Sequence, residues 1–145
     1  MNTADETTEA TRSVVQKMYG LYTEGNIEEA AYGLAEEVDW AIMAPRHLFS
    51  FAGARRGREA VLGAFQEIAH DYEFLAYNPK LILADGKQAC VYSQCVVRNR
   101  QTGHGTNMEL CAVMTVDAGK VSWFREFVDS ASTAFVLSGG AMVAA

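Results

Sequence analysis

The sequence predicts a single α+β domain in which helices cover one face of a curved antiparallel sheet and enclose a mostly apolar pocket. Two patterns support this fold class. Apolar residues recur at helical spacing through the first half of the chain, and β-branched and aromatic residues dominate strand-like segments in the second half. Helices that precede long strands favour packing of the helices on one side of the sheet. The chain has 145 residues, the usual size of one domain, so we expect one domain over 1–145, with residues 1–12 and 136–145 as peripheral tails.

Three helices are expected in the first half. Thr3 and Glu6 have the spacing of a capping box at the start of the first helix, and Gly25 ends it. A second capping signal opens a short helix over residues 26–35, and a third helix covers residues 58–70. The first and third helices carry their apolar residues on one stripe, so we expect that stripe to face the core.

One strand is expected at residues 39–43, and five more follow the third helix. Between residues 45 and 57 lies a loop with an apolar centre at residues 48–51, and we expect it to fold over the pocket as a flap. Turn sequences rich in glycine separate the later strands and predict hairpins. Those five strands are expected at residues 74–77, 80–84, 89–100, 106–116 and 120–128.

The composition argues against several classes of partner. The formal net charge is −6, whereas a nucleic-acid binder needs a basic face to neutralise phosphates. No apolar run approaches the roughly 20 residues that span a bilayer, and the polar N-terminal residues lack a secretory signal. Cys90, Cys95 and Cys111 lie in apolar stretches and are expected to be buried free thiols in a reducing compartment. We therefore expect a cytoplasmic protein with neither a nucleic-acid nor a membrane partner.

No familiar cofactor or metal motif is present. The chain lacks a glycine-rich dinucleotide fingerprint, a phosphate-binding lysine loop and a zinc-binding His-Glu-x-x-His helix. His47, His70 and His104 each lack a second ligand at metal-site spacing. We expect no metal and no cofactor.

Both alternating sets of residues in the long strands are apolar, although helices on one side of a sheet require only one apolar face. The second face is expected to pair with another copy of the chain, because a large exposed apolar surface is unusual on a monomer. In the strand at residues 89–100, one face carries Ser93, Cys95 and Val97. The expected homodimer contact uses Tyr92, Gln94 and Val96 on the other face, together with Phe127 of the last strand.

The last strand carries an acid on the face that the helices are expected to cover. Alternation places Phe124, Glu126 and Val128 on one side of the sheet and Arg125 on the other. Loss of hydration among apolar neighbours raises the pKa of a carboxyl group, which suits it to proton transfer near neutral pH. The alternative is that Glu126 pairs with an arginine or lies at an open rim.

The order of elements and two short phrases carry a resemblance to a known superfamily. The third helix opens with Gly-Arg-Glu-Ala-Val at residues 57–61, and the last strand reads Gly-Lys-Val at 119–121 and Arg-Glu-Phe-Val-Asp at 125–129. From about Ser13 to Ala134 the chain resembles the nuclear-transport-factor-like superfamily, above all its SnoaL-like and ketosteroid-isomerase-like branch. The resemblance implies a cone-shaped sheet around an open pocket. It leaves the activity open, because this scaffold hosts isomerases, cyclases, epoxide hydrolases, dehydratases and non-catalytic binders.

The limonene-epoxide-hydrolase branch of this superfamily matches the chain at one position. There an acid on the last strand transfers a proton, and the matching residue here is Glu126. That branch also carries an arginine and an aspartate on a middle strand, where this chain has Ser93 and Cys95. Its water-holding pair falls on Trp40 and Ile42, which cannot hold a water molecule in the same way.

The ketosteroid isomerases match the chain less well. Their oxyanion tyrosine falls on Met18, with Tyr19 adjacent, and their protonated aspartic acid falls on about Cys111 or Ala112. Near the place of their catalytic base the chain has only Asp39. We therefore expect the pocket of this branch without the specific activity of either relative.

Taken together, these features predict a SnoaL-like protein that binds a small hydrophobic molecule. As an enzyme it would catalyse cofactor-independent proton transfer on a carbonyl-bearing substrate, as in isomerisation, cyclisation or dehydration, with Glu126 as the acid or base. The alternative is a non-catalytic ligand-binding or assembly module with a vestigial pocket, which pairing of Glu126 with Arg98 or Arg125 would indicate. Ile42 is expected in the pocket wall. The expected substrate-binding residues are Tyr19, Tyr22, Trp40, Ile68, Tyr72, Phe74, Ser93, Val97, Met108, Leu110 and Val128.

Overall fold

The structure is a computed structural model and describes residues 2–137. No helix in this range is long and apolar enough to cross a membrane. The elements in chain order are α1 (Thr3–Thr23), α2 (Ile27–Ala31), β1 (Leu34–Met43), β2 (Gly53–Arg56), α3 (Arg58–Asp71), β3 (Tyr72–Asp85), β4 (Gln88–Asn99), β5 (Gly105–Asp117), β6 (Lys120–Val128) and α4 (Ser130–Leu137).

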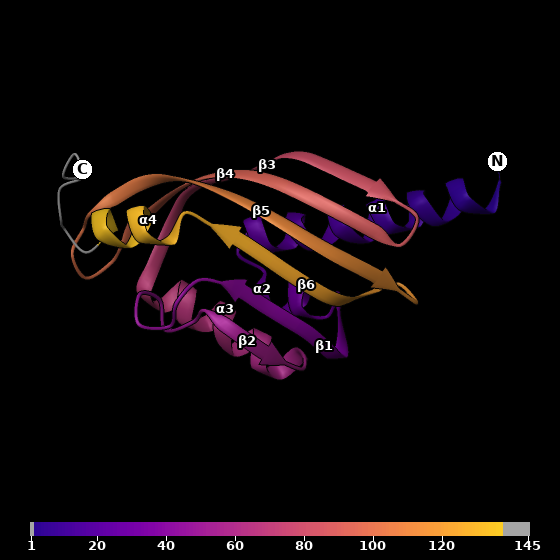
Figure 1. Ribbon diagram of the computed structural model, residues 1–145. Helices are drawn as coiled ribbons and strands as arrows, with labels where there is room; N and C mark the ends of the chain where they lie inside the picture. The colour runs from indigo at the N-terminus through magenta and orange to yellow at the C-terminus, as the bar shows by residue number, and fades with distance from the viewer. Residues whose placement is uncertain (1, 138–145) are drawn as a thin grey trace.

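The described strands form one curved sheet in the order β2-β1-β6-β5-β4-β3 (Figure 1). Neighbouring strands are antiparallel except β1 and β6, which run parallel. The last strand therefore lies between the first strand and β5, near the middle of the sheet. Its register against β1 places Phe124 beside Trp40 and Glu126 beside Ile42. The predicted α+β class is confirmed, with one parallel pair in a sheet that was expected to be antiparallel.

The helices from the first half of the chain lie on one face of this sheet. Helix α1 runs behind β3 and β4, and α3 lies against β1 (Figure 1). Apolar side chains from both layers meet between them, and Leu34, Met114 and Phe124 are among the largest that are fully buried. Helix α4 follows β6 and lies at the opposite end of the molecule from the start of α1. The start of α1 therefore lies at one end of the molecule, and α4 lies at the other.

Two of the predicted elements have different bounds in the structure. The second helix ends at Ala31, and residues expected to extend it to position 35 belong instead to β1, which begins at Leu34. Leu34 is fully buried and pairs with Val121 of β6, so sheet pairing overrides the local helix signal. The two strands expected at residues 74–77 and 80–84 are one strand, β3. Pro79 is accommodated because β3 is an edge strand and its register shifts beside this residue.

Two short elements, β2 and α4, were not predicted. Strand β2 pairs with β1, and α4 extends to Leu137, which is buried. Residues 3–12, expected to be peripheral, form the first turns of α1. Within them Thr11 is buried, and its hydroxyl donates a hydrogen bond of 2.6 Å to the Gly86 carbonyl. The remaining C-terminal tail, residues 138–145, lies outside the described residues.

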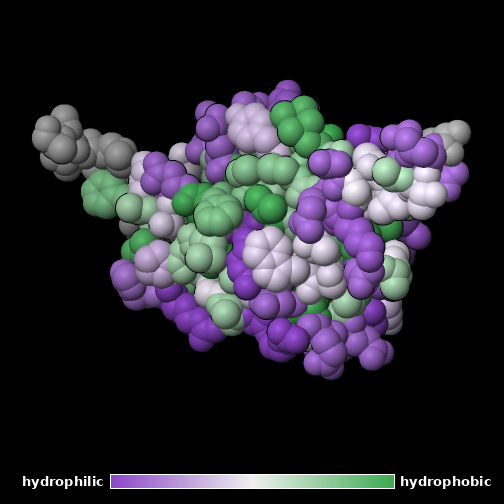
Figure 2. Space-filling view, turned by 45° about the vertical axis from the view of Figure 1, so that its right-hand side comes forward, coloured by the Kyte–Doolittle hydropathy of each residue, from purple (hydrophilic) through white to green (hydrophobic). Residues whose placement is uncertain are grey.

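The face of the sheet away from the helices carries a continuous row of large side chains. Cross-strand pairing aligns them from β3 to β1, and three members are about half exposed: Leu81 at 49%, Phe127 at 48% and Met43 at 49%. Figure 2, an oblique view of the sheet, shows hydrophobic residues gathered in the middle of the molecule above a hydrophilic border. This outer row consists of Leu81, Tyr92, Cys111, Phe127 and Met43.

Candidate functional site

The space between the sheet and the helices contains a pocket of about 90 Å³. Side chains from the helices, from the loop between β1 and β2, and from the inner faces of β1, β3, β4, β5 and β6 line it, and ten of them are aromatic. The lining residues are Met18, Tyr19, Tyr22, Ala30, Trp40, Ile42, Phe49, Phe51, Phe65, Ile68, Tyr72, Phe74, Tyr77, Val97, Met108, Leu110, Phe124, Glu126, Val128 and Leu137.

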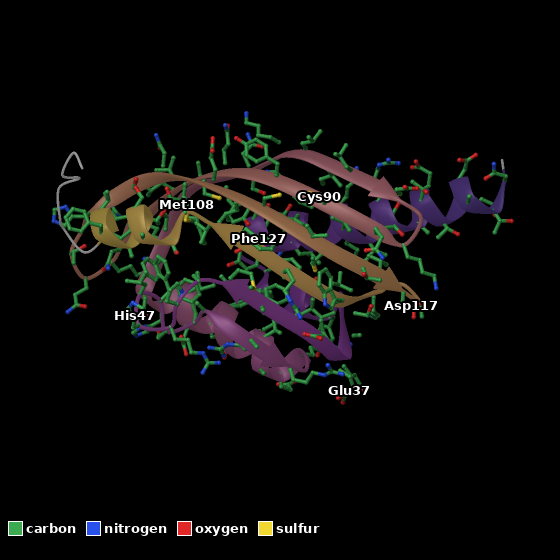
Figure 3. All side chains as sticks on the ribbon, in the orientation of Figure 1. Glu37, His47, Cys90, Met108, Asp117 and Phe127 are labelled. Carbon is green, nitrogen blue, oxygen red and sulfur yellow. The ribbon has the colours of Figure 1, made fainter. Side chains whose placement is uncertain are left out.

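The loop between β1 and β2 contributes two phenylalanines to this pocket, as the expected flap requires. The ring centroids of Phe49 and Phe51 lie 6.3 and 5.8 Å from that of Tyr72, so the three rings form one aromatic cluster. Arg46 holds the loop through hydrogen bonds of 3.1 Å to the carbonyls of residues 52 and 54. Gly53 permits this contact, because its φ is +87° and a Cβ there would lie 2.7 Å from the arginine Nε. Figure 3 shows His47 of the same loop and Met108 at the end of the molecule where α4 lies.

Among the described residues that line the pocket, Glu126 is the only acid. It projects from β6 between Phe124 and Val128, and burial raises the pKa of its carboxyl group from 4.5 to about 7. The side chain keeps a partial exposure because it borders the pocket. Among residues 2–137 no group donates a hydrogen bond to the carboxylate. A carboxyl group with such a pKa exists in both protonation states near neutral pH, as an acid–base catalyst requires.

The two arginines that could neutralise Glu126 have other partners. Arg125 points to the outer face, where it donates hydrogen bonds to the carboxylate of Asp39 at 2.9 Å and to the same residue's carbonyl at 3.1 Å. The Arg125 guanidinium also lies 4.7 Å from the centre of the Trp123 ring. Arg98 pairs with Glu73 instead. The described part of the chain thus leaves the pocket acid without a cationic partner.

Other polar groups of the pocket are also unpaired within the described range, among them the phenols of Tyr19, Tyr22 and Tyr77 and the indole of Trp40. Burial raises the pKa of the Tyr19, Tyr22 and Tyr77 phenols, and the negative charge of Glu126 raises each further. The three phenols are therefore within electrostatic reach of the acid. The buried Nε1 of Trp40 also has no hydrogen-bond partner. Buried polar groups are normally paired, so these donors are available to a bound ligand.

Comparison with known proteins identifies the family. The family model of the SnoaL-like domain matches residues 15–124. The chain belongs to the SnoaL-like domain family. No curated protein matches it.

Solved structures with the same fold are numerous. An NTF2-like protein from Burkholderia xenovorans has 22% identity and a TM-score of 0.78, with 90% of this chain and 97% of that chain covered. An LEH-like epoxide hydrolase of M. tuberculosis has 15% identity and a TM-score of 0.71, with coverage of 91% and 92%. A protein with a ketosteroid isomerase-like fold from Catenulispora acidiphila, solved with trimethylamine, has 12% identity and a TM-score of 0.73, with coverage of 88% and 93%. At these identities the likeness shows the fold alone.

The SnoaL-like pocket contains all but one of the residues expected from the sequence to bind substrate. Ser93 is the exception: its side chain is 1% exposed and does not reach the pocket. Alternation along β4 correctly gives its face, but its short side chain is covered there, whereas Leu110, opposite it on β5, reaches the pocket. A period of two predicts the face of the sheet on which a side chain lies. Whether that side chain reaches the pocket depends on where the helices pack.

Several pocket residues were missed by sequence reasoning. Tyr77 is the most consequential, because the charge of Glu126 raises the pKa of its phenol. The period-two pattern around it is broken by a register shift between Phe74 and Ala76, so its face could not be read from alternation. The apolar loop did signal Phe49 and Phe51. The other missed residues are Met18, Ala30, Phe65, Phe124 and Leu137.

Proposed function

We propose that this SnoaL-like protein is a cofactor-independent proton-transfer enzyme that acts on a small, hydrophobic, carbonyl-bearing molecule. The observation that supports it most is Glu126, a carboxyl group with a pKa of about 7 that faces an apolar pocket and has no partner among residues 2–137. The names of similar solved structures include an epoxide hydrolase and a ketosteroid isomerase-like fold, so small-molecule chemistry is represented on this scaffold.

The proposed reaction begins when ionised Glu126 removes a proton from the carbon beside the carbonyl group. The electron pair of that C–H bond moves toward the carbonyl oxygen, which becomes an enolate stabilised by hydrogen bonds from the phenols of Tyr19, Tyr22 or Tyr77. Protonated Glu126 then returns its proton to the same carbon or to a conjugated one. The pKa of about 7 allows the group to act in both directions at neutral pH.

The pocket volume limits the size of the substrate. At about 90 Å³ it is smaller than the ~150 Å³ cavity that accepts a benzene ring. A compact single-ring molecule therefore requires small movements of the lining, and Met18 and Met108 are suited to them because methionine side chains adapt readily.

Deuterium exchange tests the proposal without knowledge of the natural substrate. Small cyclic ketones are incubated with the protein in D₂O, and loss of the proton signal beside the carbonyl group is followed by NMR. We expect exchange faster than in buffer alone, with a rate that rises through pH 7. Ligand-induced shifts of pocket resonances without faster exchange would favour the alternative, a non-catalytic binding module, and the absence of both effects would count against either use of the pocket.

We also propose that two copies pair through the outer face of the sheet. The outer row is apolar across five strands, and a two-fold arrangement would cover the same row on both copies. The contact includes Tyr92, Gln94, Val96 and Phe127. Sedimentation should show a dimer at micromolar concentration, and Phe127→Glu should weaken it at least ~100-fold, because a charge would be buried without a partner. A stable wild-type monomer under these conditions would contradict this assembly.

A further inference from the structure

Two cysteines lie side by side on the outer face of the sheet, away from the pocket. The Sγ atoms of Cys90 on β4 and Cys111 on β5 are 3.7 Å apart. Cys90 pairs in register with Val113, so Cys111 is its diagonal neighbour across the two strands. Figure 3 labels Cys90 on its strand. The sequence separates the two residues, and only the hairpin between β4 and β5 brings their sulfurs into contact.

The environment of this pair differs from that of the third cysteine. Cys111 is exposed and Cys90 is partly exposed, whereas Cys95 is buried on the inner face. The expectation of three buried thiols is therefore wrong for Cys111, because its position in β5 directs it outward. Exposure is uncommon for cysteine. Burial and the adjacent Cys111 sulfur raise the pKa of the Cys90 thiol, so it remains protonated when a reagent arrives.

We propose that Cys90 and Cys111 form a reversible dithiol–disulfide pair that reacts with small disulfide oxidants such as oxidised glutathione. The exposed Cys111 attacks as a thiolate, forms a mixed disulfide and releases one glutathione thiolate. Cys90 then loses its proton to solvent and attacks the Cys111 sulfur, which releases the second glutathione. The protein loses two electrons and two protons, and the oxidant becomes two molecules of reduced glutathione.

The contact geometry makes the intrachain product reachable and easily reversed. The sulfurs must approach by roughly 1.7 Å to reach the S–S bond length of about 2.05 Å. Diagonal positions on neighbouring strands are farther apart than most bridged cysteines, so the bond would form with strain. A strained and exposed disulfide is reduced more readily than a structural one. The pair thus has the properties of a redox-responsive site.

Pairing of two copies would cover this site, because Cys111 lies between Tyr92 and Phe127 in the outer row. The free monomer is then the species that reacts with the oxidant. The experiment should be done at a protein concentration low enough to keep the chain monomeric. Phe127→Glu provides a second route to the exposed monomer.

The experiment treats the full chain with oxidised glutathione and measures free thiols after unfolding, together with the intact mass. We expect two thiols to disappear together with a mass loss of two hydrogen atoms, and reduced glutathione to restore both. Trypsin should then yield residues 88–98 linked to residues 101–120. Because residues 88–98 contain both Cys90 and Cys95, Cys95→Ala is the matched control and should retain the link.

Two other products would overturn the proposal. One is a stable adduct of a single glutathione on Cys111 with Cys90 still free. The other is a disulfide between Cys111 residues of two chains, visible as a covalent dimer on a non-reducing gel. With Cys111→Ser the intrachain link should vanish while Cys95 stays reduced, and retention of a link in that variant would also contradict the assignment. Circular dichroism spectra that match wild type confirm that each variant is folded.

Discussion

Charged residues on the two faces of the sheet have opposite surroundings, and two adjacent positions on β6 show this most clearly. Arg125 points outward and engages Asp39 and the Trp123 ring, whereas Glu126 points inward to aromatic side chains and has no partner in the described range. The outer pair is ordinary surface electrostatics, with Asp39 well exposed. A buried acid without a partner destabilises its ionised form. Its retention in the pocket is consistent with a chemical role rather than with stability.

The largest expected effect comes from removing the inner acid. Glu126→Gln should reduce deuterium exchange of a ketone at least ~100-fold, because general base catalysis typically contributes that much or more. Asp39→Asn is the matched control, since it makes the same change on the outer face, and should change the exchange rate less than ~2-fold. NMR measures both rates under identical conditions. Equal effects of the two substitutions would remove the distinction between the faces.

The second largest effect is expected on the pH dependence of stability. Glu126 has a folded pKa of about 7 against an ordinary value of 4.5. The stability that it contributes is therefore fully present below pH 4.5 and is lost as pH rises through 7. The shift corresponds to a loss of about 3 kcal/mol. Denaturant unfolding of wild type and Glu126→Gln at several pH values measures it, and the variant should lose less stability than wild type over this interval. Parallel profiles for the two proteins would mean that the acid is not desolvated.

Replacement of Glu126 by alanine should reduce the stability of the fold more than replacement by glutamine. Glu126→Ala removes side-chain volume from the pocket wall beside Phe124 and Val128, so neighbouring atoms lose contacts. At pH 7.5 we expect it to be less stable than Glu126→Gln by about 1 kcal/mol. Denaturant titration of the two variants gives the difference directly. If the two variants are equally stable, the Glu126 side chain must contact more water than its burial in the structure implies.

The smallest effect is expected on the outer face. Asp39→Ala removes partly exposed ion pairs with Arg125 and Arg56, and each such pair contributes about 0.2–1 kcal/mol. High salt should reduce the difference from wild type, because it screens exposed charges. Chemical denaturation in urea at low and high salt measures both. A loss above about 3 kcal/mol would show that the outer pair behaves like a buried one.

The contrast between the faces also explains which features the sequence could predict. Alternation along β6 placed Glu126 inward and Arg125 outward, and helical spacing predicted that the apolar stripes of α1 and α3 face the core. These patterns are local. The parallel pairing of β1 with β6, the end of α2 at Ala31 and the depth of Ser93 depend on contacts between distant segments. A period of two or 3.6 residues contains no information about them.

The candidate site could be predicted only in part, again because the patterns in the sequence are local. An acid in an otherwise apolar strand signalled Glu126, and aromatic residues at regular spacing signalled most of the pocket. Tyr77 was hidden by a shift in strand register. The exposure of Cys111 followed from its alternation with Leu110 and Ala112, both buried, but an apolar stretch of sequence does not reveal which of its two faces lacks a covering layer.

The position of β6 between β1 and β5 has a consequence for how the chain reaches this structure. Until β6 is in place, β1 and β5 each present an unpaired edge, and the second partner of β1 lies 84 to 87 residues later in the chain. Pairings across such a long separation form slowly, because the chain loses much entropy before the contact is made. Exposed strand edges also recruit other chains. A fragment that stops before residue 120 would have helices α1 to α3 and five of the six strands, yet it should aggregate rather than fold.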